Sequence, residues 1–478
     1  MTTSVAPSAT FAQTLGRITR HAWPVLISQW AGISFGVLDT AMTGHASPTA
    51  LAAMALAASI YITIFVGLMG VVHALIPIIG QHFGARRLEA VGAAWGQGVW
   101  LALGLSVVGA SLMAMPDVWL SFSGDIAPDV RASIANYLYA LILALPAALV
   151  FRTIYSLGTA VSRPKMVMMI GLGSVAVKAT LNYALIYGNW GFPELGAAGA
   201  GLSTAMVYWL SVIAGLLVMW RDPFYRQFRL HVGKPDWTIL KELLRLGIPM
   251  GGSYLVEVCA FTFMALLVAR EGTFVSGGHQ IMSNLAALCY MMPMAIGVAT
   301  ASLTAQAIGA QDPALAKRIA LAGMVLGVAG ALMTSVILLG GQSHIIAAYT
   351  NDASVAAVAA TLLPMIPLFH LFDSMQCINS YVLRAYKIAV APLVIQVLAL
   401  TLIGLVGGWW LGFGPGHELF ADTLQWILPG APQGAGTMWL MAMLGLALSA
   451  ALLHGWFWRV VAATVRTTAS PPKPTPTP

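Results

Sequence analysis

Twelve apolar segments, each long enough to cross a lipid bilayer as a helix, divide this chain of 478 residues. A hydrocarbon core of about 30 Å requires roughly 20 residues of α-helix. By that measure the spanning segments are residues 22–43, 51–79, 92–115, 133–158, 166–187, 197–220, 247–269, 280–308, 320–341, 354–382, 390–413 and 436–458. The sequence therefore predicts an all-α membrane protein with twelve transmembrane helices.

The scarcity of charged residues supports this class. Charged residues make up 8% of the chain and apolar residues 59%, whereas a soluble domain has roughly a quarter of its residues charged. That composition excludes a soluble globular protein and a disordered chain. Three cysteines, all in apolar segments, indicate no disulfide framework. The net charge of +7 is dispersed along the chain, so we expect no nucleic-acid partner.

The basic residues indicate the orientation of the chain in the membrane. If the N-terminus is cytoplasmic, 19 of the 23 Lys and Arg residues fall on the cytoplasmic side. The exceptions are Arg131 and Arg270 on the outer side, and Arg152 and Lys178 within spans. Cytoplasmic loops of membrane proteins carry the excess of Lys and Arg. The pattern predicts a multi-pass membrane protein with both termini in the cytoplasm.

Matches between the two halves of the chain indicate a duplication. A shift of 225 residues places Pro24 on Pro249, and a shift of 221 places Pro146 on Pro367. Because each half has six spans, the repeats keep the same orientation and are related by a pseudo-two-fold axis along the membrane normal. The predicted parts are listed in order: an N-terminal lobe at 1–220, a cytoplasmic linker at 221–245, a C-terminal lobe at 246–460 and a disordered cytoplasmic tail at 461–478.

Three acidic residues lie within spans, namely Asp39, Glu257 and Asp373. Each costs about 2–3 kcal/mol to insert, so each requires a partner or a function. A buried carboxyl group can exchange a proton with water, or exchange that proton for Na⁺, which prefers oxygen ligands. We therefore predict these three acids as sites for a coupling ion or a substrate, with Na⁺ assigned to Glu257 and Asp373. A packing role for each acid is the alternative.

Two basic residues and a group of large side chains complete the predicted site. The 221-residue shift places Arg152 on Asp373, and Lys178 lies midway along the fifth span. Lys178 either forms a structural ion pair, is a neutral amine, or gates a carboxylate of its own lobe. Aromatic and methionine side chains, among them Tyr290, Met292 and Phe369, are predicted to line a cavity for organic cations. The alternative for each of them is that the side chain faces lipid or packs between helices.

No motif for an enzyme is present in the sequence. The ten histidines form no H-E-x-x-H motif, and there is no P-loop and no G-x-S-x-G motif. We expect no enzymatic activity and no cofactor other than Na⁺ or H⁺ as a coupling ion. A membrane-embedded enzyme or scaffold remains the least favoured alternative.

Several segments resemble the multidrug and toxic compound extrusion (MATE) transporters, especially their bacterial NorM branch. The matching segments are PVLISQWAGISFGVLDTAMTGHASPTALAAMALAASIY, YGNWGFPELGAAGAGLSTAMVYW, YLVEVCAFTFMALLVA, HQIMSNLAALCYMMPMAIGVATASLTAQAIGAQD and FDSMQCINSYVLRAYK. They occur in family order from about residue 16 to 460. The resemblance implies two six-helix lobes around a V-shaped central cavity, and cation-coupled drug antiport.

The resemblance also implies roles for individual residues. Asp39 matches the acid of the first span that is proposed as a proton or substrate site, and Glu257 and Asp373 match acids associated with ion coupling and drug binding. Phe369 stands where some relatives have Tyr. Lys178 stands where relatives usually have Asn, and Asn182 where another branch has a second Asp. A lysine near Asp39 would hold that carboxyl group ionised, which favours coupling through Glu257 and Asp373.

These features together predict a Na⁺- or H⁺-coupled antiporter of the bacterial inner membrane that exports amphipathic cationic drugs or toxins by alternating access. We expect a monomer in contact with membrane lipids. A flippase or exporter of a lipid-linked or metabolite substrate is the alternative, and it would require a cavity rich in Arg and Lys.

Overall fold

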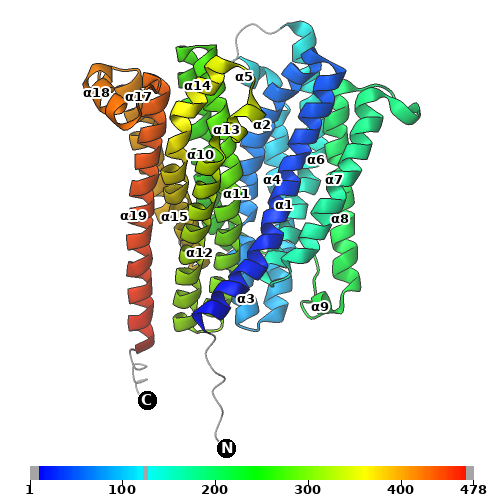
Figure 1. The fold of residues 1–478 in the computed structure, drawn as a ribbon. Helices are drawn as coiled ribbons and strands as arrows, with labels where there is room; N and C mark the ends of the chain where they lie inside the picture. Colours follow the sequence, from blue (N-terminus) through cyan, green and yellow to red (C-terminus); the bar gives the residue numbers. More distant parts are fainter. Residues whose placement is uncertain (1–9, 122–126, 470–478) are drawn as a thin grey trace, which may run out of the picture. The chain divides into compact units, whose positions relative to one another are not determined.

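The computed structural model describes residues 10–121 and 127–469, and within these ranges every regular element is a helix (Figure 1). Among the described residues, twelve helices are long and apolar enough to cross a membrane. Each of them overlaps one of the twelve spans predicted from the sequence, which confirms the all-α membrane class. The chain forms two compact units.

The N-terminal unit comprises Arg20–Cys259. Its helices are α1 (Phe11–Ala46), α2 (Pro48–Val72), α3 (Leu75–Gly84), α4 (Leu88–Met113), α5 (Pro116–Leu120), α6 (Pro128–Ala160), α7 (Pro164–Tyr187), η1 (Asn189–Gly191), α8 (Gly196–Arg221), α9 (Pro223–Arg226) and α10 (Trp237–Val268). The beginning of α1 and the end of α10 belong to the other unit.

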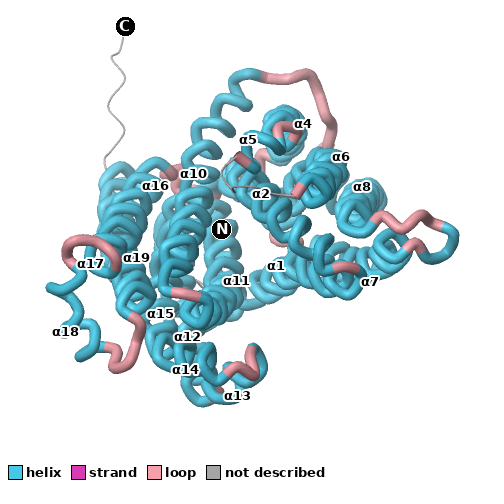
Figure 2. Tube along the Cα trace, turned by 90° about the horizontal axis from the view of Figure 1, so that it is seen from above, coloured by secondary structure: helices cyan, strands magenta, loops and turns pink. Residues whose placement is uncertain are grey.

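Helix α6 is the centre of the N-terminal unit and packs against α2, α4, α7 and α8 (Figure 2). The contact between α6 and α8 depends on Gly201. A Cβ atom at this position would lie 2.9 Å from the Cβ atom of Ala140 and 3.1 Å from the carbonyl oxygen of Tyr137. Within a membrane the hydrophobic effect does not drive helices together, so they associate through close packing, and small residues permit the backbones to approach closely.

The C-terminal unit comprises Ala260 onwards together with the start of α1, up to Thr19. Its further helices are η2 (Ala269–Glu271), α11 (Thr273–Gly309), α12 (Pro313–Gly340), α13 (Gln342–Tyr349), α14 (Ala353–Leu362), η3 (Leu363–Met365), α15 (Ile366–Ala385), α16 (Val390–Gln396), the π-helical η4 (Val397–Gly407), α17 (Gly408–Gly412), α18 (His417–Ile427) and α19 (Gln433–Ala469). Helix α15 is the centre of this unit and packs against α11, α12 and α19.

The helix boundaries differ in detail from those expected. The second predicted span, 51–79, is interrupted between Val72 and Leu75, where α2 ends and α3 begins. The segment 221–245 contains α9 and the first turns of α10. Helix α19 continues to Ala469, beyond the predicted boundary at 460, and the last nine residues of the predicted tail lie outside the described residues.

Candidate functional site

An ion pair between Asp39 of α1 and Lys178 of α7 lies inside the N-terminal unit. The Lys178 Nζ atom is 2.7 Å from Asp39 Oδ1, and the two side chains are 0% and 8% exposed. At that burial the attraction is little screened by solvent. A side chain left buried without its partner would carry an uncompensated charge, so each residue stabilises the ionised form of the other.

Helix α8 supplies the remaining contacts of the lysine. Lys178 Nζ donates to the Thr204 hydroxyl at 2.6 Å, to the Ser203 hydroxyl at 2.7 Å and to the Ala200 carbonyl at 2.9 Å. With the Asp39 carboxylate, four oxygen atoms surround an ammonium group that has three protons. The ammonium group therefore occupies a cation site lined by oxygen atoms, in which each of its protons has an acceptor and its charge is balanced by the carboxylate.

Asn182, one turn after Lys178 on α7, connects the acid to the same network. Its amide donates to Asp39 Oδ1 at 2.7 Å, and its carbonyl oxygen accepts a short hydrogen bond from the Ser203 hydroxyl. Asn182 is fully buried. The structure therefore brings together three of the predicted residues, Asp39, Lys178 and Asn182.

Sequence reasoning missed Ser203 and Thr204 as ligands of the lysine. A signal for them is present in the segment GAAGAGLST, in which two hydroxyl residues follow a run of small residues. The small residues bring α8 close to α7. A Cβ atom added to Gly199 would lie 2.4 Å from the carbonyl oxygen of Leu185 on α7.

The variant Gly199→Ala is therefore expected to push α8 away from α7 and to destabilise the protein by about 1–3 kcal/mol, because the blocking atom belongs to the backbone. Gly173→Ala on α7 is the matched control, since a Cβ atom there meets nothing within 4 Å. Thermal unfolding in detergent compares the two variants. Equal stabilities would contradict this account of the helix contact.

Helix α1 is held to the rest of the N-terminal unit near this network. The Tyr187 hydroxyl of α7 donates to the Met42 carbonyl at 2.8 Å. One turn before Asp39, the ring of Phe35 packs against that of Tyr208 on α8 with 5.8 Å between centroids. Elsewhere most side chains of α1 are exposed or half-buried. The Asp39–Lys178 pair is therefore a principal attachment of α1.

Arg152 of α6 belongs to the same unit. Its guanidinium carbon is 5.8 Å from the ring centroid of Phe65 on α2 and 5.5 Å from that of Tyr155. Among the residues that the structure describes, Arg152 forms no ion pair. Its main observed contacts are thus with aromatic faces.

Asp373 of α15 belongs to the C-terminal unit and is 5% exposed. One turn earlier on the helix, Phe369 is 2% exposed and packs its ring against Trp439 and Phe261, with centroids 5.2 and 6.2 Å apart. Cys289 of α11 interacts electrostatically with Asp373. The acid is thus buried one turn away from an aromatic cluster.

The structure places the other predicted residues as follows. Glu257 lies on α10 near the end of the N-terminal unit and is half-buried, and Tyr290 lies half-buried on α11. Met292 of α11 faces α12, where the Thr334 hydroxyl is 3.9 Å from its sulfur. Phe369 and Met292 are thus packed between helices in this conformation.

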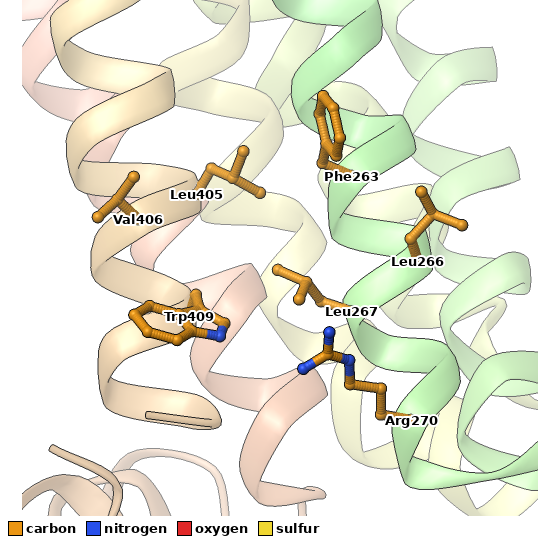
Figure 3. Close-up of a pocket in the computed structure, with 7 residues that line it drawn as sticks. All are labelled: Phe263, Leu266, Leu267, Arg270, Leu405, Val406 and Trp409. Atoms are coloured by element: carbon orange, nitrogen blue, oxygen red, sulfur yellow. The ribbon is translucent and has the colours of Figure 1, made fainter. Parts of the chain in front are cut away.

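A hollow of about 350 Å³ lies on the C-terminal unit between the end of α10 and the η4–α17 segment (Figure 3). Apolar side chains and Arg270 line it. None of the predicted site residues contributes to it. Within the described part of the chain, no group of three or more His, Cys, Asp or Glu side chains is arranged to hold a metal ion.

Comparison with known proteins identifies the family. The MatE family model matches residues 24–184 and again residues 249–410. This chain belongs to the MatE family. The two matched stretches of the MatE chain begin 225 residues apart, which is the shift between Pro24 and Pro249. The resemblance seen in the sequence is thereby confirmed.

Relatives of this MatE chain are similar to it over nearly their whole length. It is 39% identical over 459 residues to a protein of Aromatoleum aromaticum called probable multidrug resistance protein NorM, covering 95% of this chain and 96% of the relative. It is 30% identical over 439 residues to the multidrug resistance protein MdtK of Pectobacterium atrosepticum, covering 91% and 93%.

Solved structures share the fold. The eukaryotic MATE transporter AtDTX14 matches with a TM-score of 0.84 at 20% identity, over 96% of this chain and all of that chain. The Vibrio cholerae MATE transporter VcmN in its bent form matches with a TM-score of 0.81 at 17% identity, over 96% and 98%. At these identities the likeness shows the twelve-helix fold alone.

Proposed function

We propose that this MatE-family protein exports amphipathic organic cations across the bacterial inner membrane in exchange for inward-moving Na⁺ or H⁺, by alternating access. The relatives named as multidrug resistance proteins support drug export. Buried carboxyl groups in both units support cations as the substrates. The monomeric state, the contact with lipids and the cytoplasmic position of both termini are part of the proposal.

The ion pair of the N-terminal unit is the observation that carries the assignment of the coupling site. Asp39 already holds a cation, because the Lys178 ammonium group lies 2.7 Å from its carboxylate. A mobile Na⁺ or proton would have to displace an ammonium group that has three further oxygen partners. We therefore assign ion coupling to Glu257 and Asp373, and a structural role to the Asp39–Lys178 pair.

Coupling then follows from competition at the two remaining acids. An ionised carboxyl group attracts an organic cation, and a proton or Na⁺ bound to the same group removes that attraction. Transport is coupled when the inward- and outward-facing arrangements differ in their affinity for the ion, because only a differential affinity shifts the equilibrium between them. Ion binding from outside would release the drug outside.

An exporter of anionic or lipid-linked substrates is less well supported. Such a transporter requires several basic residues facing its cavity. Of the two basic residues that the sequence places within spans, Lys178 is already neutralised by Asp39. A membrane-embedded enzyme lacks support in the sequence motifs and in the names of the relatives.

Purified protein in lipid vesicles tests the proposal. We expect ethidium to move against its concentration gradient when either a Na⁺ gradient alone or a pH gradient alone is imposed, and the effective gradient identifies the coupling ion. Vesicles without protein are the control. Failure of both gradients to drive any cationic dye would contradict the proposed function.

A further inference from the structure

The hollow on the C-terminal unit has no part in the proposed export of cations. Its volume of about 350 Å³ lies within the range of about 300–1,000 Å³ that is usual for ligand sites. One wall is the end of α10, and the other is the π-helical η4 with the start of α17 (Figure 3). Apart from Arg270, every residue that lines the hollow is apolar.

The wall formed by η4 is apolar and exposed because the other side of this segment is pressed against α19. A Cβ atom added to Gly445 of α19 would lie 2.5 Å from the carbonyl oxygen of Ala399 in η4. The large side chains of Val406 and Trp409 line the hollow and are 48% and 40% exposed. Segments of π-helix are rare and are frequently found at functional sites.

Arg270 brings a positive charge to one end of this hollow. Figure 3 shows its guanidinium group at the same end as the ring of Trp409, with Phe263 at the opposite end. Among the residues that the structure describes, Arg270 forms no ion pair. Arg131, the other arginine that the sequence places on the outer side, is paired with Asp117 at 3.1 Å. Arg270 is therefore available to an external anion.

The acid that follows Arg270 in the chain is engaged elsewhere. The Glu271 carboxylate accepts hydrogen bonds from the backbone N–H groups of Gly434 and Ala435, each at 2.7 Å. These two residues lie in the first turn of α19, where a carboxylate satisfies free N–H groups and balances the helix dipole. Both carboxylate oxygens are thus used at α19, and the charge of Arg270 in the hollow is left without a partner.

The chemistry of the hollow fits a molecule with an apolar chain and an anionic head. Water finds no hydrogen-bond partners along apolar walls. An acyl chain fills such a space and restores the van der Waals contacts that a void forfeits. A phosphate group at the other end accepts from the guanidinium group of Arg270. Tryptophan, here Trp409, is typical of the level at which lipid headgroups meet water.

The absence of an acid among the lining residues favours a net negative headgroup. The ammonium group of a zwitterionic headgroup would meet the positive charge of Arg270 and would find no carboxylate in the hollow. Basic pockets between membrane helices bind anionic lipid headgroups for this reason.

We propose that the hollow between α10 and η4 is a binding site for an anionic phospholipid of the outer leaflet. The acyl chain lies against Phe263 and Val406, and the phosphate group lies on Arg270. The site is independent of the proposed export of cations. Its assignment to the outer leaflet rests on the proposed orientation, in which α10 ends on the outer side.

Native mass spectrometry of purified, delipidated protein tests the inference. The detergent solution contains phosphatidylglycerol, which is anionic, and phosphatidylethanolamine, which is zwitterionic, at equal concentrations. We expect the wild type to retain phosphatidylglycerol preferentially. Arg270→Gln should lower the affinity for phosphatidylglycerol about fivefold or more and leave that for phosphatidylethanolamine unchanged. Arg131→Gln is the matched control and should change neither affinity.

A second variant, Val406→Trp, places a larger side chain in the hollow and should weaken binding of both lipids. Val336→Trp on α12 is its control, since Val336 is 72% exposed and does not line the hollow. The inference is overturned if the wild type binds the two lipids equally, or if Arg270→Gln binds phosphatidylglycerol as Arg131→Gln does. Equal losses in the two tryptophan variants would instead show lipid adhering to the apolar surface in general. These measurements involve no transport, so a failure of export in vesicles is detected separately.

Discussion

Replacing Lys178 with Met is expected to lower the free energy of unfolding by about 3–5 kcal/mol, the usual cost of leaving one partner of a buried ion pair alone. The side chain is fully buried, and its four oxygen partners lie within 2.9 Å of Nζ. Methionine keeps most of the length of the side chain and removes the charge. Thermal unfolding in detergent measures the loss.

The double variant Asp39→Asn/Lys178→Met is the control for this prediction. It removes both charges and should recover most of the stability, because a buried ion pair replaced as a whole costs little. Asn182 can still hydrogen-bond to an asparagine at position 39. If the double variant loses as much free energy of unfolding as Asp39→Asn and Lys178→Met lose together, the two residues do not interact energetically.

A smaller substitution at the same position leaves the oxygen-lined site vacant. In Lys178→Ala the Asp39 carboxylate, the Ala200 carbonyl and the hydroxyl groups of α8 remain, and hard cations prefer such oxygen ligands. We expect NaCl to raise the unfolding temperature of this variant more than choline chloride does, and to have no such specific effect on the wild type. Equal effects of the two salts on the variant would contradict a cation site at this position.

The sequence was sufficient for the membrane class and the number of spans because hydropathy is a local property. The interrupted second span was not predicted, since no charged residue separates Val72 from Leu75, and the packing of α3 against α4 and α6 is not visible in a hydropathy pattern. Helix α19 continues to Ala469, past the apolar span 436–458 predicted from the sequence, because a helix can continue beyond the bilayer, where apolar length gives no signal for its end.

The candidate site, too, could be predicted from the sequence only in part. The insertion cost of charges identified Asp39 and Lys178 individually, but their pairing joins positions 139 residues apart and depends on the packing of α1, α7 and α8. The cavity-lining residues were harder to predict. In a transmembrane helix both the lipid-facing and the protein-facing sides are apolar, so composition cannot show that Met292 faces α12 or that Phe369 packs against Trp439.

The variants Glu257→Gln and Asp373→Asn should abolish gradient-driven dye efflux in lipid vesicles, reducing it to the rate of vesicles without protein. Each substitution preserves the size of the side chain and removes the exchangeable charge. Asp373 is 5% exposed and lies in the spanning helix α15, and Glu257 lies within the span of α10. Without differential ion binding, an ion gradient cannot shift the equilibrium between the two arrangements.

A loss of coupling must be distinguished from a loss of folding. The same substitutions at exposed positions, Glu194→Gln and Asp129→Asn, are the controls and should retain full efflux. In the two site variants, exchange of dye down its own gradient should persist at saturating dye, because the fold and the path for the dye remain. Dye affinity should fall about tenfold or more with the loss of the charge. Full gradient-driven efflux in either variant would remove that acid from the coupling mechanism and return Asp39 to consideration, in spite of its pairing with Lys178.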